Sequence, residues 1–356
     1  DRLTGLARND WDTQELSWGY ARDPLVDARS SPAPLAELWA RVNEGRDQRV
    51  EEARTLESAN NKMFLAAYGL LGELDYEVRK DQVALRENAD WQYPTAKSEV
   101  ERRDASRCDS IVELVSYAVG CMFGRYSLDV PGLILADQGA TLQDYLTKVP
   151  QPTFAPDVDN VLPIVDGDWF EDDIVARFRQ FLRAAFGEEH FEENLRFVEE
   201  SLGVKALREY FITRAGRSKF YDDHVKRYKK RPIYWLFSST KGSFNALIYM
   251  HRYTPSTVST VLNEYLREFE SKLEANLQHQ ERLAAGDGTP REKAAALKES
   301  ERLRKVLLEL GEYEHDVLYP LASQQIAIDL DDGVKVNYPR FYPALKKITG
   351  LEAADE

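Results

Sequence analysis

Residues 111–123 read IVELVSYAVGCMF, an apolar run with almost no polar side chain in it. A helix with so little polar surface does not lie along the outside of a domain, where one face must meet water. It belongs in the middle of a core. We therefore expect this segment to form the central helix of the N-terminal half of the chain.

The sequence on the two sides of this run is organised differently. From Leu35 to Ala67, apolar residues recur mostly at steps of three and four with charged residues between them. This pattern predicts a long amphipathic helix, or a pair of helices divided at Gly45. Prolines and glycines interrupt any long element between residues 131 and 165. The expected organisation is an N-terminal helical lobe at 1–130 and a Pro/Gly-rich connector at 131–165.

The C-terminal lobe is expected to span residues 166–356. A helix should begin at Asp168, because Glu171 follows it at the spacing of a capping box. Residues 255–318 carry two long apolar stripes that are separated by Gly286-Asp287-Gly288. Two helices of about 28 residues joined by so short a turn must run antiparallel, and each would extend for about 40 Å as a helical arm.

Two short segments in this lobe carry strand signals. Aromatic and branched residues on either side of Lys241-Gly242 predict a β-hairpin at 233–250. A similar arrangement around Asp331-Asp332-Gly333 predicts a second small hairpin at 326–338. The expected fold class is therefore mainly α (α+β): two helical lobes with small β-hairpins and a long antiparallel helical hairpin.

Composition excludes several classes of protein. With 43% hydrophobic and 30% charged residues, the chain can bury enough apolar surface to fold. No apolar run approaches the ~18 residues of a membrane span and no signal peptide opens the chain, so a cytoplasmic location is expected. Cys108 and Cys121 would lie about 20 Å apart on one helix, which predicts free thiols. The chain opens on Asp1 without an initiator methionine, as expected for part of a longer polypeptide.

The strongest local charge feature lies within an acidic chain. The net charge is −14, so any contact with nucleic acid must be local. Residues 225–231 hold five cations and no acid, directly before the aromatic hairpin. A basic run beside exposed tyrosine and tryptophan is suited to the DNA backbone. The alternative is a solvated face, or cations that pair with the acidic surplus. The candidate DNA-binding residues are Lys226, Arg227, Lys229, Lys230, Arg231, Lys241 and Arg252.

No pattern predicts a catalytic, cofactor or metal site in this chain. A glycine-rich strand-to-helix loop is absent, and the scattered histidines lack the spacing of metal ligands. One acidic cluster could hold a divalent cation for phosphodiester hydrolysis. Carboxylates in the first turn of a helix that cap its free N–H groups are the simpler account. The cluster consists of Asp166, Asp168, Glu171, Asp172 and Asp173.

Six segments, in order and spread over nearly the whole chain, resemble one protein family. They are Asp10-Trp11-Asp12 through Ser17-Trp18, SYAVGCMFGRYSLD (116–129), DWFEDDIVARF (168–178), KRPIYWLF (230–237), ALIYMHRY (246–253) and IDLDDGVKVNY (328–338). Together they resemble the C-terminal region of the adenine-specific DNA methyltransferases of bacteriophage exclusion (BREX) systems, the phage-growth-limitation X (PglX) family.

The resemblance implies a non-catalytic role for this chain. Enzymes of that family carry an upstream domain with a glycine-containing S-adenosylmethionine motif and an Asn-Pro-Pro-Tyr-type motif that holds the flipped adenine. Neither motif occurs in this sequence. The chain is therefore expected not to methylate DNA alone, and S-adenosylmethionine is implied only for the full-length parent.

Three hypotheses about function follow. In the first, the chain assists the parent enzyme in engaging double-stranded DNA through the basic run. In the second, it docks other BREX proteins without touching DNA, because the long helical hairpin offers exposed faces and the net charge is −14. The third, an autonomous nuclease, rests on the acidic cluster alone.

Overall fold

The computed structural model describes residues 1–29 and 33–352. They form a mainly helical fold with a small amount of β structure, which confirms the predicted fold class. Two compact units are present. One contains residues 1–118, 128–133 and 179–205, and the other contains residues 119–127, 134–178 and 206–356. The division into lobes at 1–130 and 166–356 with a connector at 131–165 stays a prediction.

The first unit is built from helices around a small apolar cluster. Leu6, Val50, Ala53, Val83 and Leu85 form this cluster. The elements are α1 (Arg2–Asp12), α2 (Pro24–Asp27), α3 (Leu35–Ala67), η1 (Lys80–Gln82), α4 (Ala89–Gln92), most of α5 (Glu99–Met122), the end of α7 (Ile174–Phe186), η2 (Glu188–His190) and α8 (Phe191–Leu202). Helix α3 is continuous through Gly45, so the long-helix alternative is confirmed.

Helix α5 contains the apolar run 111–123. Ile111, Leu114, Val115, Ala118 and Met122 are all buried, which confirms the prediction of a core helix. The helix begins at Glu99, well before the apolar run, and its first turns are mostly exposed. Both cysteines are free thiols, as predicted.

A three-stranded antiparallel sheet lies in the second unit. The strands are β1 (Val161–Pro163), β2 (Tyr234–Ser238) and β3 (Asn245–Tyr249), in the order β1-β3-β2. The pair β2–β3 is the hairpin predicted at 233–250, with Leu236 opposite Leu247. Every strand residue is buried. The sheet is therefore a core element of this unit.

The prediction of a second hairpin at 326–338 was wrong. The chain forms η6 (Leu330–Asp332), α15 (Val334–Asn337) and η7 (Tyr338–Phe341) instead. The Asp329 side chain accepts a hydrogen bond from the Asp331 N–H at 3.0 Å, and the Asn337 amide donates to the Gly333 carbonyl at 3.1 Å. Such side chain–backbone bonds offer the main chain an alternative to a strand ladder.

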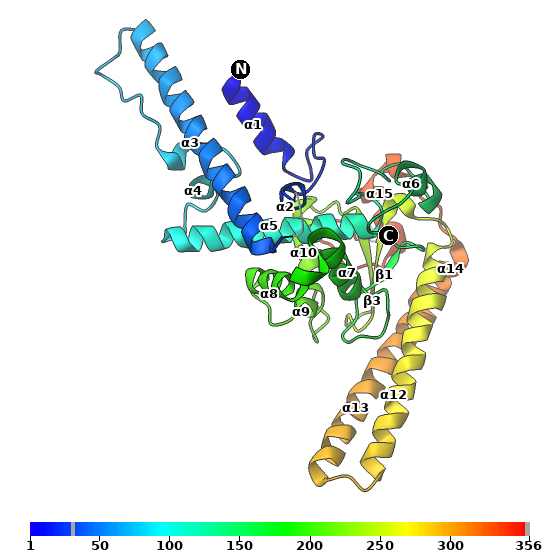
Figure 1. Cartoon of the computed structure of the whole chain (residues 1–356). Coiled ribbons are helices and arrows are strands. Elements are labelled where there is room, and N and C mark those ends of the chain that lie inside the picture. Colours follow the sequence, from blue (N-terminus) through cyan, green and yellow to red (C-terminus); the bar gives the residue numbers. More distant parts are fainter. Residues whose placement is uncertain (30–32, 353–356) are drawn as a thin grey trace. The chain divides into compact units, whose positions relative to one another are not determined.

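The second unit also contains the helical arm. Helix α12 (Arg267–Ala285) and helix α13 (Pro290–Tyr313) lie side by side and antiparallel (Figure 1). A capping box begins α13, because Glu292 N–H donates to Thr289 Oγ1 at 3.3 Å and Thr289 N–H donates to Glu292 Oε2 at 2.8 Å. The adjoining elements are α11 (Thr257–Thr260), the π-helical turns η4 (Val261–Leu266) and η5 (Glu314–Leu318), and α14 (Tyr319–Gln324).

Four further elements complete this unit. They are α6 (Leu142–Lys148), α9 (Leu207–Phe211), α10 (Lys219–Arg227) and η3 (Met250–Arg252). None of the helices in the described part of the chain is long and apolar enough to span a membrane.

Candidate nucleic-acid interface

Helix α10 carries the beginning of the predicted basic run and is anchored to the sheet by His224. The Nε2 atom of this buried histidine accepts a hydrogen bond from the backbone N–H of Tyr234, the first residue of β2, at 3.1 Å. Burial holds the pKa of His224 well below its usual value, and the nearby cations Arg227 and Arg125 lower that pKa further. The ring is therefore neutral, and it fixes the C-terminal end of α10 beside β2.

The chain turns sharply where α10 ends. Lys229 and Lys230 adopt left-handed backbone conformations, with φ of 51° and 62°. This conformation costs roughly 1–2 kcal/mol for each L-residue. Lys230 N–H donates to the Val225 carbonyl at 2.8 Å and Lys229 N–H to the Lys226 carbonyl at 3.0 Å, so the turn closes the end of the helix. As a result, the turn holds Lys226, Lys229 and Lys230 near one another.

These three lysines line one side of a cavity of about 480 Å³. Its other side comes from residues 346–349, which a short backbone pairing holds against β2. Ser238 N–H donates to the Ala344 carbonyl at 3.0 Å, and Lys346 N–H donates to the Leu236 carbonyl at 2.7 Å. The complete lining is Tyr221, Asp222, Val225, Lys226, Lys229, Lys230, Lys346, Lys347, Ile348 and Thr349. We call this the lysine cavity.

The lysine cavity is strongly positive within an acidic protein. Five lysines and one aspartate line it, a net charge of 5 − 1 = +4, whereas the whole chain has a net charge of −14. Lys347 pairs with Glu352 at 3.5 Å, but both side chains are exposed and such a pair contributes little. Over residues 1–29 and 33–352, Lys226, Lys229, Lys230 and Arg231 form no ion pair. The alternative in which they pair with the acidic surplus therefore does not apply to them.

The remaining candidate residues lie outside the cavity. Arg227 ends α10, and Lys241 is exposed in the turn between β2 and β3. Arg252 is buried, and its guanidinium donates to the carbonyls of Asp157 at 2.9 Å and Val158 at 3.0 Å. Because those carbonyls occupy it, Arg252 holds a loop in place and does not join the exposed lysines.

The aromatic residues next to the basic run are not exposed, contrary to the expectation from sequence. Tyr234 and Trp235 are fully buried in β2. The Trp235 ring packs edge-on against Tyr338, with 5.6 Å between ring centroids, and its Nε1–H donates to the Pro232 carbonyl at 3.2 Å. Neither ring can stack on a base. The basic run therefore has no exposed ring of β2 beside it, and cations without such a ring are suited to sequence-independent phosphate contact.

Lys346 and Lys347 were not among the residues predicted for this site. Their only signal in the sequence is their adjacency, which is common on protein surfaces. They reach the basic run because residues 344–346 pair with the edge of β2. No local pattern links that segment to α10.

The carboxylates of the acidic cluster make separate structural contacts and do not converge on one point. Helix α7 begins at Ile174, so the helix start predicted at Asp168 was wrong, and the actual cap is Asp173. Its Oδ1 accepts the Ala176 N–H at 2.7 Å and its Oδ2 accepts Arg208 Nη2 at 2.6 Å. No His, Cys, Asp and Glu side chains among the described residues are grouped so that three could hold a metal ion.

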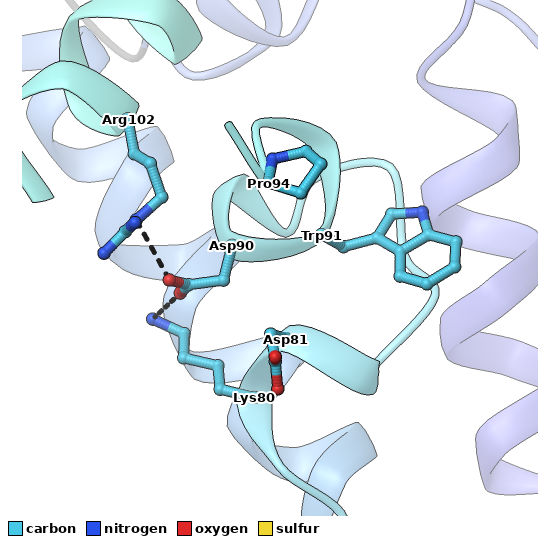
Figure 2. Close-up of a pocket in the computed structure, with 6 residues that line it drawn as sticks. All are labelled: Lys80, Asp81, Asp90, Trp91, Pro94 and Arg102. Atoms are coloured by element: carbon cyan, nitrogen blue, oxygen red, sulfur yellow. Dashed lines mark ion pairs between the residues drawn. The ribbon is translucent and has the colours of Figure 1, made fainter. Parts of the chain in front are cut away.

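A second pocket, in the first unit, differs from the lysine cavity. It has a volume of about 720 Å³ and is lined by Lys80, Asp81, Asp90, Trp91, Pro94 and Arg102. The Asp90 carboxylate lies between Arg102 at 3.0 Å and Lys80 at 3.4 Å, whereas Trp91 points away from them (Figure 2). Both cations are thus paired with a carboxylate of the pocket itself. The two cations and the two carboxylates that line this pocket balance, so it has no excess of positive charge.

Comparison with known proteins identifies relatives along nearly the whole chain. No family model matches it. The chain is 35% identical over 358 residues to the adenine-specific methyltransferase BrxX of Escherichia coli O9:H4 (strain HS), an alignment that covers 97% of the chain and 29% of that protein. It is 31% identical over 360 residues to the adenine-specific methyltransferase PglX of Lacticaseibacillus casei (strain Zhang), covering 99% of the chain and 28% of that protein. The chain thus spans less than a third of the length of these relatives, and it belongs to the PglX family of BREX adenine-specific methyltransferases.

Proposed function

We propose that this chain is a non-catalytic C-terminal region of an N6-adenine DNA methyltransferase of a BREX phage-defence system. It acts in the cytoplasm and assists the parent enzyme in engaging double-stranded DNA. The observation that carries this proposal is the lysine cavity, where five lysines from two distant segments gather on a chain of net charge −14. The relatives are named adenine-specific methyltransferases, which supports adenine as the base on which the parent acts.

The electrostatics favour contact with the DNA backbone. Most of an acidic surface repels polyphosphate, so a complex can form only where cations are concentrated and unpaired. The turn at Lys229 and Lys230 is such a place, and Arg231 directly follows it. With Tyr234 and Trp235 buried, the contact would position DNA without reading its sequence. Reading of the target site is assigned to other parts of the parent.

S-adenosylmethionine is proposed as a cofactor of the parent and not of this chain. The small sheet of the described residues is antiparallel throughout, and no glycine-rich turn leads from one of its strands into a helix. The S-adenosylmethionine motif of such methyltransferases contains glycine, which lets backbone N–H groups approach the cofactor closely. The residues present do not fit this cofactor, and no methyl-transfer step is assigned to them.

Replacing Lys229, Lys230 and Arg231 together with serine should weaken DNA binding by the methyltransferase that contains this chain. Each lost phosphate contact lowers the slope of log K against log salt by about 0.9, so the slope should flatten by up to about 2.7. Fluorescence anisotropy with a labelled duplex, over a series of salt concentrations, measures both affinity and slope.

The matched control removes three exposed cations from α13, by replacing Arg291, Lys298 and Lys305 with serine. The change in net charge is the same, so a general charge effect would appear in both variants. If affinity and slope of the Lys229/Lys230/Arg231 variant match those of the wild type while its circular dichroism is unchanged, the basic run has a structural role only.

A second candidate function is the docking of another BREX protein on the helical arm. The observation that favours it is the exposure of large apolar side chains there: Leu283 is 48% exposed, Leu297 56% and Leu308 66%. Replacing these three leucines with serine should abolish capture of a BREX partner in a pull-down while DNA binding is preserved. Undiminished capture by the correctly folded variant would remove the arm from consideration.

A further inference from the structure

The lysine cavity has a shape that a flat basic patch lacks. Its lysines line a hollow together with Val225, which is half-buried, and with Tyr221 and Ile348, which expose only 2% and 6% of their surface. The volume of about 480 Å³ falls within the range of small-ligand sites. A DNA duplex is convex and touches such a surface only with separate phosphodiesters. A hollow with cations beside an apolar floor suits a compact ligand that has a charged end and a flat apolar end.

The positive charge of the cavity also exceeds the negative charge of one phosphodiester. Of the five lysines, one pairs with Glu352 and one carboxylate, Asp222, belongs to the lining, which leaves 5 − 2 = 3 positive charges without a counter-charge. A phosphodiester carries one negative charge. A terminal phosphate carries between about 1.5 and 2 at neutral pH, and a diphosphate carries more. The cavity therefore has enough positive charge for a terminal phosphate as well as for a single phosphodiester of a DNA strand.

We infer that the lysine cavity binds a nucleoside phosphate, with its terminal phosphate held by the lysines of the cavity and its base over the apolar floor. Two sources share this chemistry: a free nucleotide, and the 5′-phosphorylated end of a DNA strand. The inference rests on the proposed function in one respect only: both take the lysines of the cavity to bind phosphate groups. The left-handed turn at Lys229 and Lys230 is consistent with it, because strained backbone is often retained at binding sites.

Calorimetric titration of the chain with ADP tests the inference. Saturable binding is expected, with adenosine and pyrophosphate each binding at least tenfold more weakly than ADP because each lacks one half of the contacts. The variant Lys229→Ser/Lys346→Ser should weaken ADP binding at least tenfold. The control Lys298→Ser/Lys305→Ser makes the same charge change on exposed residues of α13 and should bind ADP like the wild type.

Two further arms identify the source of the ligand. A 5′-phosphorylated single-stranded oligonucleotide is compared with its unphosphorylated twin. A preference of about tenfold for the phosphorylated strand assigns the cavity to DNA ends, whereas equal binding of the twins together with ADP binding assigns it to free nucleotides. Both outcomes support a nucleoside-phosphate site.

The inference is overturned if no phosphorylated probe binds at about 1 mM, or if the Lys229→Ser/Lys346→Ser variant binds ADP as tightly as the wild type. Duplex DNA without terminal phosphates is titrated in parallel, so the two proposals can fail separately. Salt-dependent duplex binding without ADP binding supports the proposed function and overturns the inference. ADP binding without duplex binding supports the inference and overturns the proposed function.

Discussion

Gly216→Ala is expected to lower the free energy of unfolding by about 3–5 kcal/mol. Gly216 has φ +70°, and a Cβ atom built on it would lie 2.2 Å from the Lys241 carbonyl oxygen and 2.9 Å from Gly242 Cα. Both neighbours are backbone atoms of the β2–β3 turn. That turn is closed by hydrogen bonds from Gly242 N–H to Ser239 O at 2.8 Å and from Ser239 N–H to Phe244 O at 3.0 Å. It cannot move aside without breaking them, and urea denaturation followed by fluorescence measures the loss.

Gly333→Ala is the matched control for this prediction. Gly333 lies in the same unit and also has a positive φ of +76°, but nothing lies within 4 Å of the Cβ position. It should therefore lose only the conformational cost of an L-residue at φ 76° and ψ 172°, a region that glycine almost alone adopts, about 1–3 kcal/mol. Equal losses in the two variants would show that φ alone is responsible, and that the contact between the two backbone segments is looser than the structure shows.

Asp173→Ala is expected to lower the free energy of unfolding by about 3–4 kcal/mol. The Asp173 side chain is 1% exposed, caps α7 through the Ala176 N–H at 2.7 Å, and pairs with Arg208 Nη2 at 2.6 Å. Its removal leaves a helix end uncapped and a largely buried guanidinium without its innermost carboxylate. Arg208 keeps its bonds to Asp168 and to the Val165 carbonyl, which limits the loss.

Glu171→Ala is the control for Asp173, because Glu171 belongs to the same acidic cluster and is exposed. Its loss should stay below about 0.5 kcal/mol. Thermal melts with and without Mg²⁺ separate this structural account from the nuclease hypothesis. If Mg²⁺ raised the melting temperature of the wild type and both substitutions removed that increase, the cluster would be a cation site and the structural account would be wrong.

Elements whose signals lie within a few residues were predicted well. The hairpin β2–β3 has its aromatic strands and its turn in one short stretch, and the arm has a capping box at Thr289. The false hairpin at 326–338 shows the limit of this approach. Its alternating residues resembled strands, but the Asp329 and Asn337 side chains bond to nearby backbone groups and hold the chain in short helical turns.

Strand β1 illustrates a different limit. Its three residues lie in a stretch rich in prolines and glycines, where no strand was expected. They form a strand because Leu162 pairs with Leu247 of β3, far along the chain. A strand this short has no stability of its own and exists only where the rest of the sheet provides a partner.

The sequence by itself determined the family, the mainly helical fold class, the buried helix at 111–123 and the presence of a basic run, because these depend on composition or on neighbours a few residues apart. Only the tertiary structure decided what that run can contact. It buries Tyr234 and Trp235, occupies Arg252 with main-chain carbonyls, and adds Lys346 and Lys347 to the lysines of the basic run. The physical reason is that exposure and charge pairing are properties of segments brought together by folding. Here a single backbone pairing along the edge of β2 holds residues 344–346 in place, and so creates the lysine cavity.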